Sequence, residues 1–157
     1  LAGLLPMRSG QVEIVGHPVY RAQSPTPRGW RRHALGLMPQ RAFFWNSLSL
    51  HENLALAAWA KGIPVEPAPL DRVGLAGKER QSTRTLSLGE QQRVNVLRAF
   101  MGNAPVILAD EPTASLDDMH AQELLTLLRE IQGERAMLVS SHDARLAPFV
   151  DRIITLP

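Results

Sequence analysis

The chain has 157 residues, of which 45% are apolar and 20% are charged, a balance typical of one globular domain. Its formal net charge of +2 and its short arginine cluster at 28–32 are too small for a nucleic-acid-binding surface, so we expect no nucleic-acid partner. The lack of cysteine excludes disulfides, thiolate metal sites and cysteine nucleophiles, and no apolar run approaches the ~20 residues of a membrane-spanning helix.

The first predicted elements are two strands. Apolar and polar residues alternate around Val12, Ile14 and Val19, which predicts a half-exposed strand. The short apolar run 35–38 predicts a second strand, and the Pro-Gln that follows it predicts a loop.

A helix and an irregular stretch come next. Ser49 and Glu52 have the spacing of a capping box, so a helix is predicted to begin there and to end near 62–64. Segment 64–85 contains three prolines and is expected to be irregular, with one turn of helix at 70–73.

The second half of the chain alternates helix and strand signals more strongly. A capping box formed by Ser87 and Glu90 predicts a helix that ends at 102–103, and a further amphipathic helix is predicted over 118–132. Three apolar runs fit two buried parallel strands and a last strand: 105–109, 137–140 and 152–156. Strands that alternate with helices predict an α/β fold with a largely parallel sheet.

Both ends of the chain look cut. The first residue is Leu1 rather than methionine, residues 1–5 have the pattern of the end of a helix, and Pro157 follows directly after an apolar run. We therefore expect an N-terminally truncated part of a domain.

Two adjacent acids, Asp110 and Glu111, follow the apolar run 105–109. In open α/β sheets the ligand crevice lies at the carboxyl ends of the strands. Neighbouring residues at a strand end point in different directions, so one acid could bind magnesium while the other acts as a base toward water. Taken alone, the pair could equally be a helix cap with a solvated neighbour.

The surrounding residues resemble the motifs of ATP-binding-cassette (ABC) ATPases. The resemblance comprises a Walker B motif, a D-loop, an ABC signature (usually written LSGGQ), a Q-loop glutamine and an H-loop: 106–113, 114–117, 86–94, Gln40 and 140–143. The motifs occur in the family's order and cover essentially all 157 residues. The resemblance implies a P-loop NTPase-like (RecA-like) fold with a helical subdomain at about 41–101 and the remaining core motifs at 102–157.

The resemblance also implies catalytic roles. Glu111 would be the general base, and Asp110 would hold Mg²⁺ through water. Gln40 would reach Mg²⁺ and the attacking water, and His142 would contact the γ-phosphate of ATP. The other histidines show no ligand spacing and are interpreted as solvated: His17, His33, His51 and His120.

The residues of the signature also favour phosphate binding for a physical reason. Ser87 would cap a helix whose amino end carries free N–H groups and partial positive charge, which favour an anion. By resemblance, Ser87, Gly89 and Glu90 would bind ATP held by the other subunit, and Asp117 would shape the contact between subunits. Leu88 replaces the usual glycine; we expect it to point away from the phosphate, since a positive φ would strain it.

The glycine-rich phosphate loop, G-x-x-x-x-G-K-[ST], is absent from the sequence, and neither lysine, Lys61 or Lys78, follows a glycine-rich strand end. We expect this Walker A loop to lie upstream of residue 1, which would leave the chain inactive by itself.

The implied function is that of the ATP-binding and ATP-hydrolysing subunit of an ABC membrane transporter, with ATP and Mg²⁺ as cofactors. Two such subunits would close head to tail and drive transmembrane permease subunits from the cytoplasmic face of the cell membrane. The run 108–113 looks most like exporters of the lipoprotein-releasing and macrolide type.

Two alternatives stay open. A DNA-repair or chromosome-maintenance ABC ATPase is disfavoured because only 85 residues precede Leu86 and they carry no heptad repeat. A non-catalytic regulatory or structural module is disfavoured by the intact Glu111 and His142.

Overall fold

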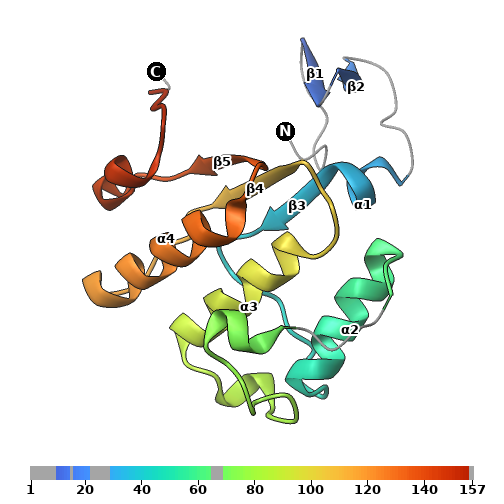
Figure 1. Ribbon diagram of the computed structural model, residues 1–157, viewed down its shortest axis with the longest axis vertical. Coiled ribbons are helices and arrows are strands. Elements are labelled where there is room, and N and C mark those ends of the chain that lie inside the picture. Colours follow the sequence, from blue (N-terminus) through green and yellow to red (C-terminus); the bar gives the residue numbers. More distant parts are fainter. Residues whose placement is uncertain (1–9, 15, 22–28, 65–68, 156–157) are drawn as a thin grey trace.

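The computed structural model describes residues 10–14, 16–21, 29–64 and 69–155. At its centre is a three-stranded parallel sheet with the order β3-β4-β5, formed by Leu35–Met38, Val106–Asp110 and Ala136–Ser140. The middle strand β4 pairs with both neighbours, Leu35 opposite Val106 and Val106 opposite Ala136 (Figure 1). The expected α/β fold with a largely parallel sheet is confirmed.

Within the described residues, four α-helices accompany the sheet: α1 Trp30–Ala34, α2 Leu50–Lys61, α3 Leu88–Phe100 and α4 Asp118–Gln132. Both predicted capping boxes are present. In each, a serine side chain accepts from the backbone N–H of the third helical residue, and the glutamate there accepts from the serine N–H. Gly62 ends α2 in the left-handed conformation, which residues with a Cβ adopt at a cost.

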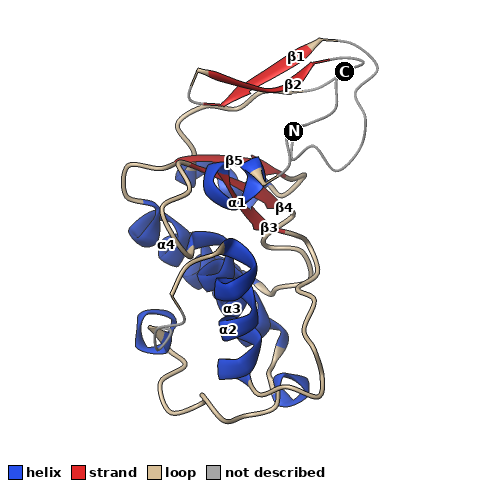
Figure 2. Ribbon diagram, turned by 90° about the vertical axis from the view of Figure 1, so that its right-hand side faces the viewer, coloured by secondary structure: helices blue, strands red, loops and turns tan. Residues whose placement is uncertain are grey.

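The expected strand around Val12, Ile14 and Val19 is a hairpin. β1 (Gln11–Ile14) and β2 (His17–Arg21) pair antiparallel and form a sheet of their own. In both views the hairpin lies beyond the parallel sheet, on the side away from α2 and α3 (Figures 1 and 2).

The core lies between the parallel sheet and the helices. α3 approaches β3 so closely that a Cβ on Gly36 would stand 2.1 Å from the Ala99 carbonyl oxygen. α4 adds a buried stripe with helical spacing, formed by Ala121, Leu124, Leu125, Leu128 and Ile131. Leu127, expected on this stripe, is only partly buried; Leu125 takes that place.

Segment 64–85 is irregular, as predicted, but it contributes to the core. Its described residues contain two 3₁₀ turns, η1 at Leu70–Val73 and η2 at Thr83–Thr85. Leu70, Val73 and Leu75 are almost fully buried. Burying side chains of this size stabilises a fold by about 1.5–3 kcal/mol each, so the segment is fastened by its apolar contacts.

Two predictions near the C-terminus are wrong in part or in full. The strand expected at 137–140 is present as β5, but it is not buried. Its alternate residues are exposed, Leu138 to 46%, and no described strand pairs with its outer edge. The described residues 152–155 form no strand, although Leu156 lies outside the described part. They follow the 3₁₀ helix η3 (Ala144–Phe149), and no described strand lies beside them to pair with their backbone. Ile153 and Ile154 are therefore largely exposed.

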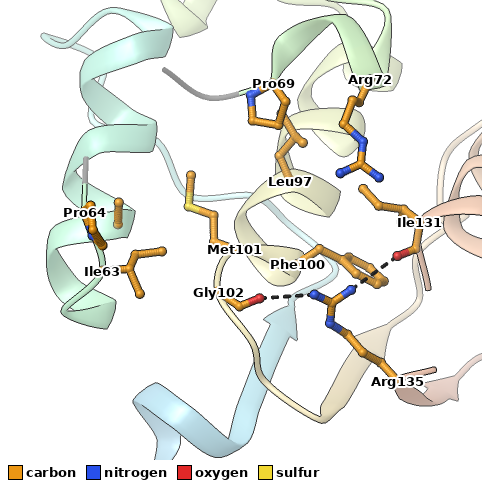
Figure 3. A pocket seen from close by; sticks show the side chains of 11 residues that line it. Ile63, Pro64, Pro69, Arg72, Leu97, Phe100, Met101, Gly102, Ile131 and Arg135 are labelled. Atoms are coloured by element: carbon orange, nitrogen blue, oxygen red, sulfur yellow. Dashed lines mark hydrogen bonds between the residues drawn. The ribbon is translucent and has the colours of Figure 1, made fainter. Parts of the chain in front are cut away.

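The C-terminal end of α3 borders a hollow of about 270 Å³ between α2, η1 and α4 (Figure 3). Arg135 donates to the carbonyl oxygens of Gly102 and Ile131, and its guanidinium lies 5.6 Å from the Phe100 ring centroid. Lys61 donates to two further carbonyls, of Ala99 at 3.2 Å and Met101 at 2.9 Å. These cations satisfy backbone oxygens that a helix end leaves without partners.

Candidate functional site

Three predicted site residues lie at one edge of the parallel sheet. Asp110 ends β4, Gln40 follows β3 by two residues, and His142 follows β5 by two. In the β4–β5 ladder Asp110 stands directly opposite Ser140. The carboxyl ends of adjacent parallel strands therefore bring the acids and the histidine together, as the strand order requires.

Glu111 is held in an uncommon conformation. Its φ of 45° lies in the left-handed region, which few residues other than glycine adopt, and its N–H donates to the Ser140 carbonyl at 2.8 Å. The carboxylate accepts from the Ser141 hydroxyl at 2.8 Å and from the His142 backbone N–H at 3.2 Å. Its Oε1 also lies 2.7 Å from His142 Nδ1.

These contacts favour the ionised form of Glu111 and orient the His142 ring. Burial alone would raise the pKa of Glu111, but the hydrogen bonds from His142 and Ser141 together lower it. An ionised carboxylate only accepts hydrogen bonds, so Nδ1 of His142 carries the proton. The imidazole is 89% exposed, which leaves its Nε2 edge open to a ligand.

Asp110 supplies oxygen ligands of the kind that Mg²⁺ prefers. It is exposed, and its Oδ1 accepts from the Ser140 hydroxyl at 2.5 Å. Within the described ranges no cluster of three or more His, Cys, Asp or Glu side chains surrounds a metal position. A site with one or two protein oxygens fits Mg²⁺ that shares its coordination with phosphates and water.

The amino-terminal tip of α3 is accessible. Ser87 is exposed and Gly89 is half-buried. Leu88 is 45% exposed, and it lies in the first turn of the helix without a positive φ, so its backbone carries no strain of that kind. That Leu88 points away from the phosphate stays a prediction.

Glu90 faces its own chain. Its carboxylate accepts from the Ser87 N–H at 2.7 Å and forms an ion pair with Lys78. Lys78 and the Ser87 N–H lower the pKa of Glu90, in that order of importance. The Glu90 carboxylate therefore stabilises the tip from within.

Asp117 caps α4 and also binds a histidine that we interpreted as solvated. It accepts from the His120 backbone N–H at 2.9 Å, and both carboxylate oxygens lie 2.8 Å from His120 Nδ1. The ring of His120 comes within 3.4 Å of where a Cβ on Gly89 would stand. The side chain of His120 is still 41% exposed, so the interpretation as a solvated residue holds in part, but Asp117 fixes its ring beside the tip of α3.

Sequence reasoning missed a group of polar residues beside this site, which we call the clasp: Thr113, Asp143 and Arg145. The fully buried Thr113 hydroxyl donates to Asp143 Oδ2 at 2.5 Å, and Arg145 Nε and Nη2 bind the same carboxylate at 2.8–3.0 Å. The Arg145 guanidinium holds the pKa of Asp143 well below its usual range. No spacing signal points to the clasp, because its members come from two loops that only the fold brings together.

Gln40 is exposed and lies farther along the same edge. Its loop lines a hollow of about 270 Å³ together with Leu88 of α3 and Ser115. Another, of about 340 Å³, lies between Glu111, His142 and the clasp. The predicted residues thus surround two neighbouring depressions rather than one.

No helix in the described part of the chain has the length and apolar character needed to cross a membrane. The family model described as "ABC transporter" matches residues 1–114.

An uncharacterized ABC transporter ATP-binding protein of Mycobacterium tuberculosis is 35% identical over 99% of the chain and 49% of its own length. The putative hemin import ATP-binding protein HrtA of Staphylococcus aureus is 34% identical over 99% of the chain and 74% of its own length. A solved dimeric ATP-binding cassette in a post-hydrolysis state with ADP and Pi superposes with a TM-score of 0.76 at 26% identity, covering 94% of this chain and 69% of that one. The chain spans about half the length of the mycobacterial relative. With its motifs at the edge of a parallel sheet, the chain belongs to the ABC transporter family.

Proposed function

We propose that the chain forms part of the ATP-binding and ATP-hydrolysing subunit of a membrane transporter, with Glu111 as the general base. The observation that carries this proposal is the ionised Glu111 carboxylate, held at the end of β4 by His142 and Ser141 beside Asp110. A base must be unprotonated and aimed before it can take a proton from water, and these hydrogen bonds supply both conditions.

The neighbouring side chains would have the other catalytic roles. His142 orients Glu111 through Nδ1 and offers Nε2 to a phosphate oxygen. Asp110, with the Ser140 hydroxyl, would hold Mg²⁺, whose charge would stabilise negative charge on the phosphates when the ion is bound. Gln40 would reach the metal and the attacking water from the end of β3.

The tip of α3 suits ATP held by a second subunit. It is exposed, and the small side chains of Ser87 and Gly89 leave the backbone accessible to a phosphate. Glu90 would act through Ser87, which it fastens, and Asp117 would contact the paired subunit. We expect the pair to close head to tail.

The loop after Gln40 suits a permease subunit. Phe43 is 78% exposed and Trp45 is 65% exposed, yet the loop is well fixed, since buried Asn53 binds the backbone of Trp45 in both directions, at 2.8 Å and 3.1 Å. A rigid loop that displays aromatic side chains is typical of a protein interface. We therefore place the protein at the cytoplasmic face of the cell membrane, bound through a permease partner.

The same proposal assigns residues 41–101 to the helical subdomain and residues 102–157 to the catalytic core. The run 108–113 favours an exporter of the lipoprotein-releasing and macrolide type.

The base assignment is tested in the full-length natural protein by Glu111→Gln. Steady-state ATPase activity should fall about 10²–10⁴-fold, the range that general bases contribute, while binding of a fluorescent ATP analogue is retained. The matched control is Glu130→Gln, at an exposed residue near the carboxyl end of α4. Undiminished turnover in Glu111→Gln would remove Glu111 from the base role.

The shared site is tested by Ser87→Arg, which places a long side chain on the exposed tip. ATP-dependent pairing, followed by light scattering in the Glu111→Gln background, should disappear, whereas Thr126→Arg on the exposed side of α4 should pair normally. ATP-dependent pairing of Ser87→Arg would show that the tip does not meet the partner's nucleotide. Binding of ATP without hydrolysis or pairing would favour a non-catalytic module.

A further inference from the structure

One side of α3 carries three polar side chains where packing alone would favour apolar ones. Gln92, Asn95 and Arg98 are spaced by three residues and therefore form a stripe along the helix. Each donates to a backbone carbonyl of the loop that follows β3. The distances are 3.0 Å from Gln92 to Gln40, 2.8 Å from Asn95 to Pro39, and 2.5 Å from Arg98 to Phe43. We call these three residues the α3 ladder.

Two members of the ladder are almost completely buried. Gln92 is 2% exposed and Asn95 is 1% exposed, and the Asn95 amide also donates to Gln92 Oε1 at 3.4 Å. A buried amide that loses its partner costs about 1–3 kcal/mol, so these side chains strongly favour the arrangement in which the loop lies against the helix.

Arg98 extends the ladder to the aromatic part of the loop. Its guanidinium lies 5.7 Å from the centroid of the Phe44 ring, while it donates to the neighbouring Phe43 carbonyl. Burial lowers the pKa of Arg98, but arginine stays charged at any pH at which proteins fold. The ladder thus reaches from the residues next to Gln40 to the two phenylalanines.

The same helix carries the signature at its tip. Gln92 is five residues from Ser87 within one α-helix, which transmits displacement as a rigid element. The loop and the tip also border one hollow, which Gln40, Leu88 and Gln91 line together. A shift of the loop therefore has a short, continuous route to the tip.

We propose that the α3 ladder fastens the Gln40 loop to the signature helix, so that the loop and the tip move as one body. Gln92, Asn95 and Arg98 are then positioning residues: they touch neither nucleotide nor partner, but they connect the surface for the permease with the surface for the second ATP. This inference rests on the proposed function for its consequence, but the fastening itself is a property of the chain.

The fastening is tested by hydrogen exchange of the Trp45 and Leu48 amides of this loop in the nucleotide-free, full-length protein. Their N–H groups are hydrogen-bonded, to Asn53 Oδ1 at 2.8 Å and to the Trp45 carbonyl at 3.0 Å. Arg98→Met removes the donor and the charge, and these amides should exchange at least about tenfold faster, since about 1.4 kcal/mol corresponds to a factor of ten. Arg98→Lys retains a cation and should restore part of the protection. The matched control is Arg129→Met on the exposed side of α4, which should change nothing.

A loss of folding is recognised by the amides of α4 at 124–128. If they keep their protection while Trp45 and Leu48 lose it, the ladder fastens the loop. Unchanged exchange at Trp45 and Leu48 in Arg98→Met would overturn the proposal. If Arg98→Met also loses protection in α4, Asn95→Leu, which keeps the size of a buried side chain, is measured by the same criterion.

The coupling is tested in the Glu111→Gln background, with and without ATP. In the otherwise unchanged protein, pairing through the tip should alter exchange at Trp45 and Leu48, and Arg98→Met should abolish this response while pairing persists. A response of equal size in both proteins would refute the coupling. Failure of the unchanged protein to pair would count against the proposed function instead, and the nucleotide-free measurement would still decide the fastening.

Discussion

The clasp of Thr113, Asp143 and Arg145 allows a stability prediction from named atoms. Asp143→Ala removes the hydrogen-bond acceptor of the buried Thr113 hydroxyl and leaves the Arg145 guanidinium without its main acceptor. We expect the protein to become less stable by about 1–3 kcal/mol, most of it the cost of a buried hydroxyl that loses its partner.

Two contributions give this magnitude. An unpaired buried hydroxyl costs about 1–3 kcal/mol. The ion pair adds less, because Arg145 is 34% exposed, keeps a 2.7 Å contact with Asp118, and is partly screened by water. The Thr113 hydroxyl, although uncharged, therefore accounts for the larger part.

A double-mutant cycle separates the two contributions. Thr113→Val replaces the hydroxyl with a methyl group of similar size, so Asp143→Ala should cost about 1–2 kcal/mol less in that background than in the unchanged protein. Urea titrations give the free energy of unfolding of each of the four proteins in the cycle. Asp151→Ala, a change at an exposed residue, serves as the control. Additivity within about 0.5 kcal/mol would show that the threonine is not held by Asp143 and would refute the argument.

Three further predictions concern single sites. Burial, with Arg135 and Arg98 nearby, lowers the pKa of Lys61 from 10.5 to about 8. Between those pH values the unfolded chain therefore binds a proton that the folded chain has released. The free energy of unfolding should rise by about 1–2 kcal/mol from pH 8 to pH 10.5. Lys61→Met should reduce this pH dependence, as measured by urea titrations. His142→Ala should raise the pKa of Glu111 in a carboxyl NMR titration, since burial would then act against fewer hydrogen bonds; an unchanged pKa would contradict the assigned contact. Gly36→Ala should destabilise the protein by about 3 kcal/mol in thermal or urea unfolding, because the added Cβ meets a backbone oxygen at 2.1 Å that cannot rotate away; a neutral effect would contradict the close packing of β3 on α3.

Local signals predicted the elements whose causes are local. The strand at 35–38 and the helices at 50–61 and 118–132 have the expected bounds, because apolar runs and capping residues fix them within a few positions. The prediction failed where a partner far along the chain decides. Residues 137–140 have the composition of a buried strand, yet Leu138 is exposed because burial depends on what covers the outer edge of β5.

The same distinction between local and long-range causes applies to the candidate site. The meeting of Asp110, Glu111 and His142 follows from the rule that ligands lie at the carboxyl ends of parallel strands. The α3 ladder could not be predicted, because Gln92 and Asn95 look like residues of a solvated helix face. They are buried only because α3 packs against β3 on one side and the Gln40 loop on another.

The backbone at the end of β4 connects stability with the proposed chemistry. Glu111 and Ser115 both have positive φ, of 45° and 65°, a conformation that costs residues with a Cβ of order 1 kcal/mol or more. Between them lies Thr113, which the clasp fixes, so the surrounding fold rather than the Glu111 side chain holds this turn in place. Glu111→Gln should therefore leave the geometry of the site intact and change only its basicity. Asp143→Ala should instead displace Glu111 and lower ATPase activity, although Asp143 itself takes no part in the chemistry.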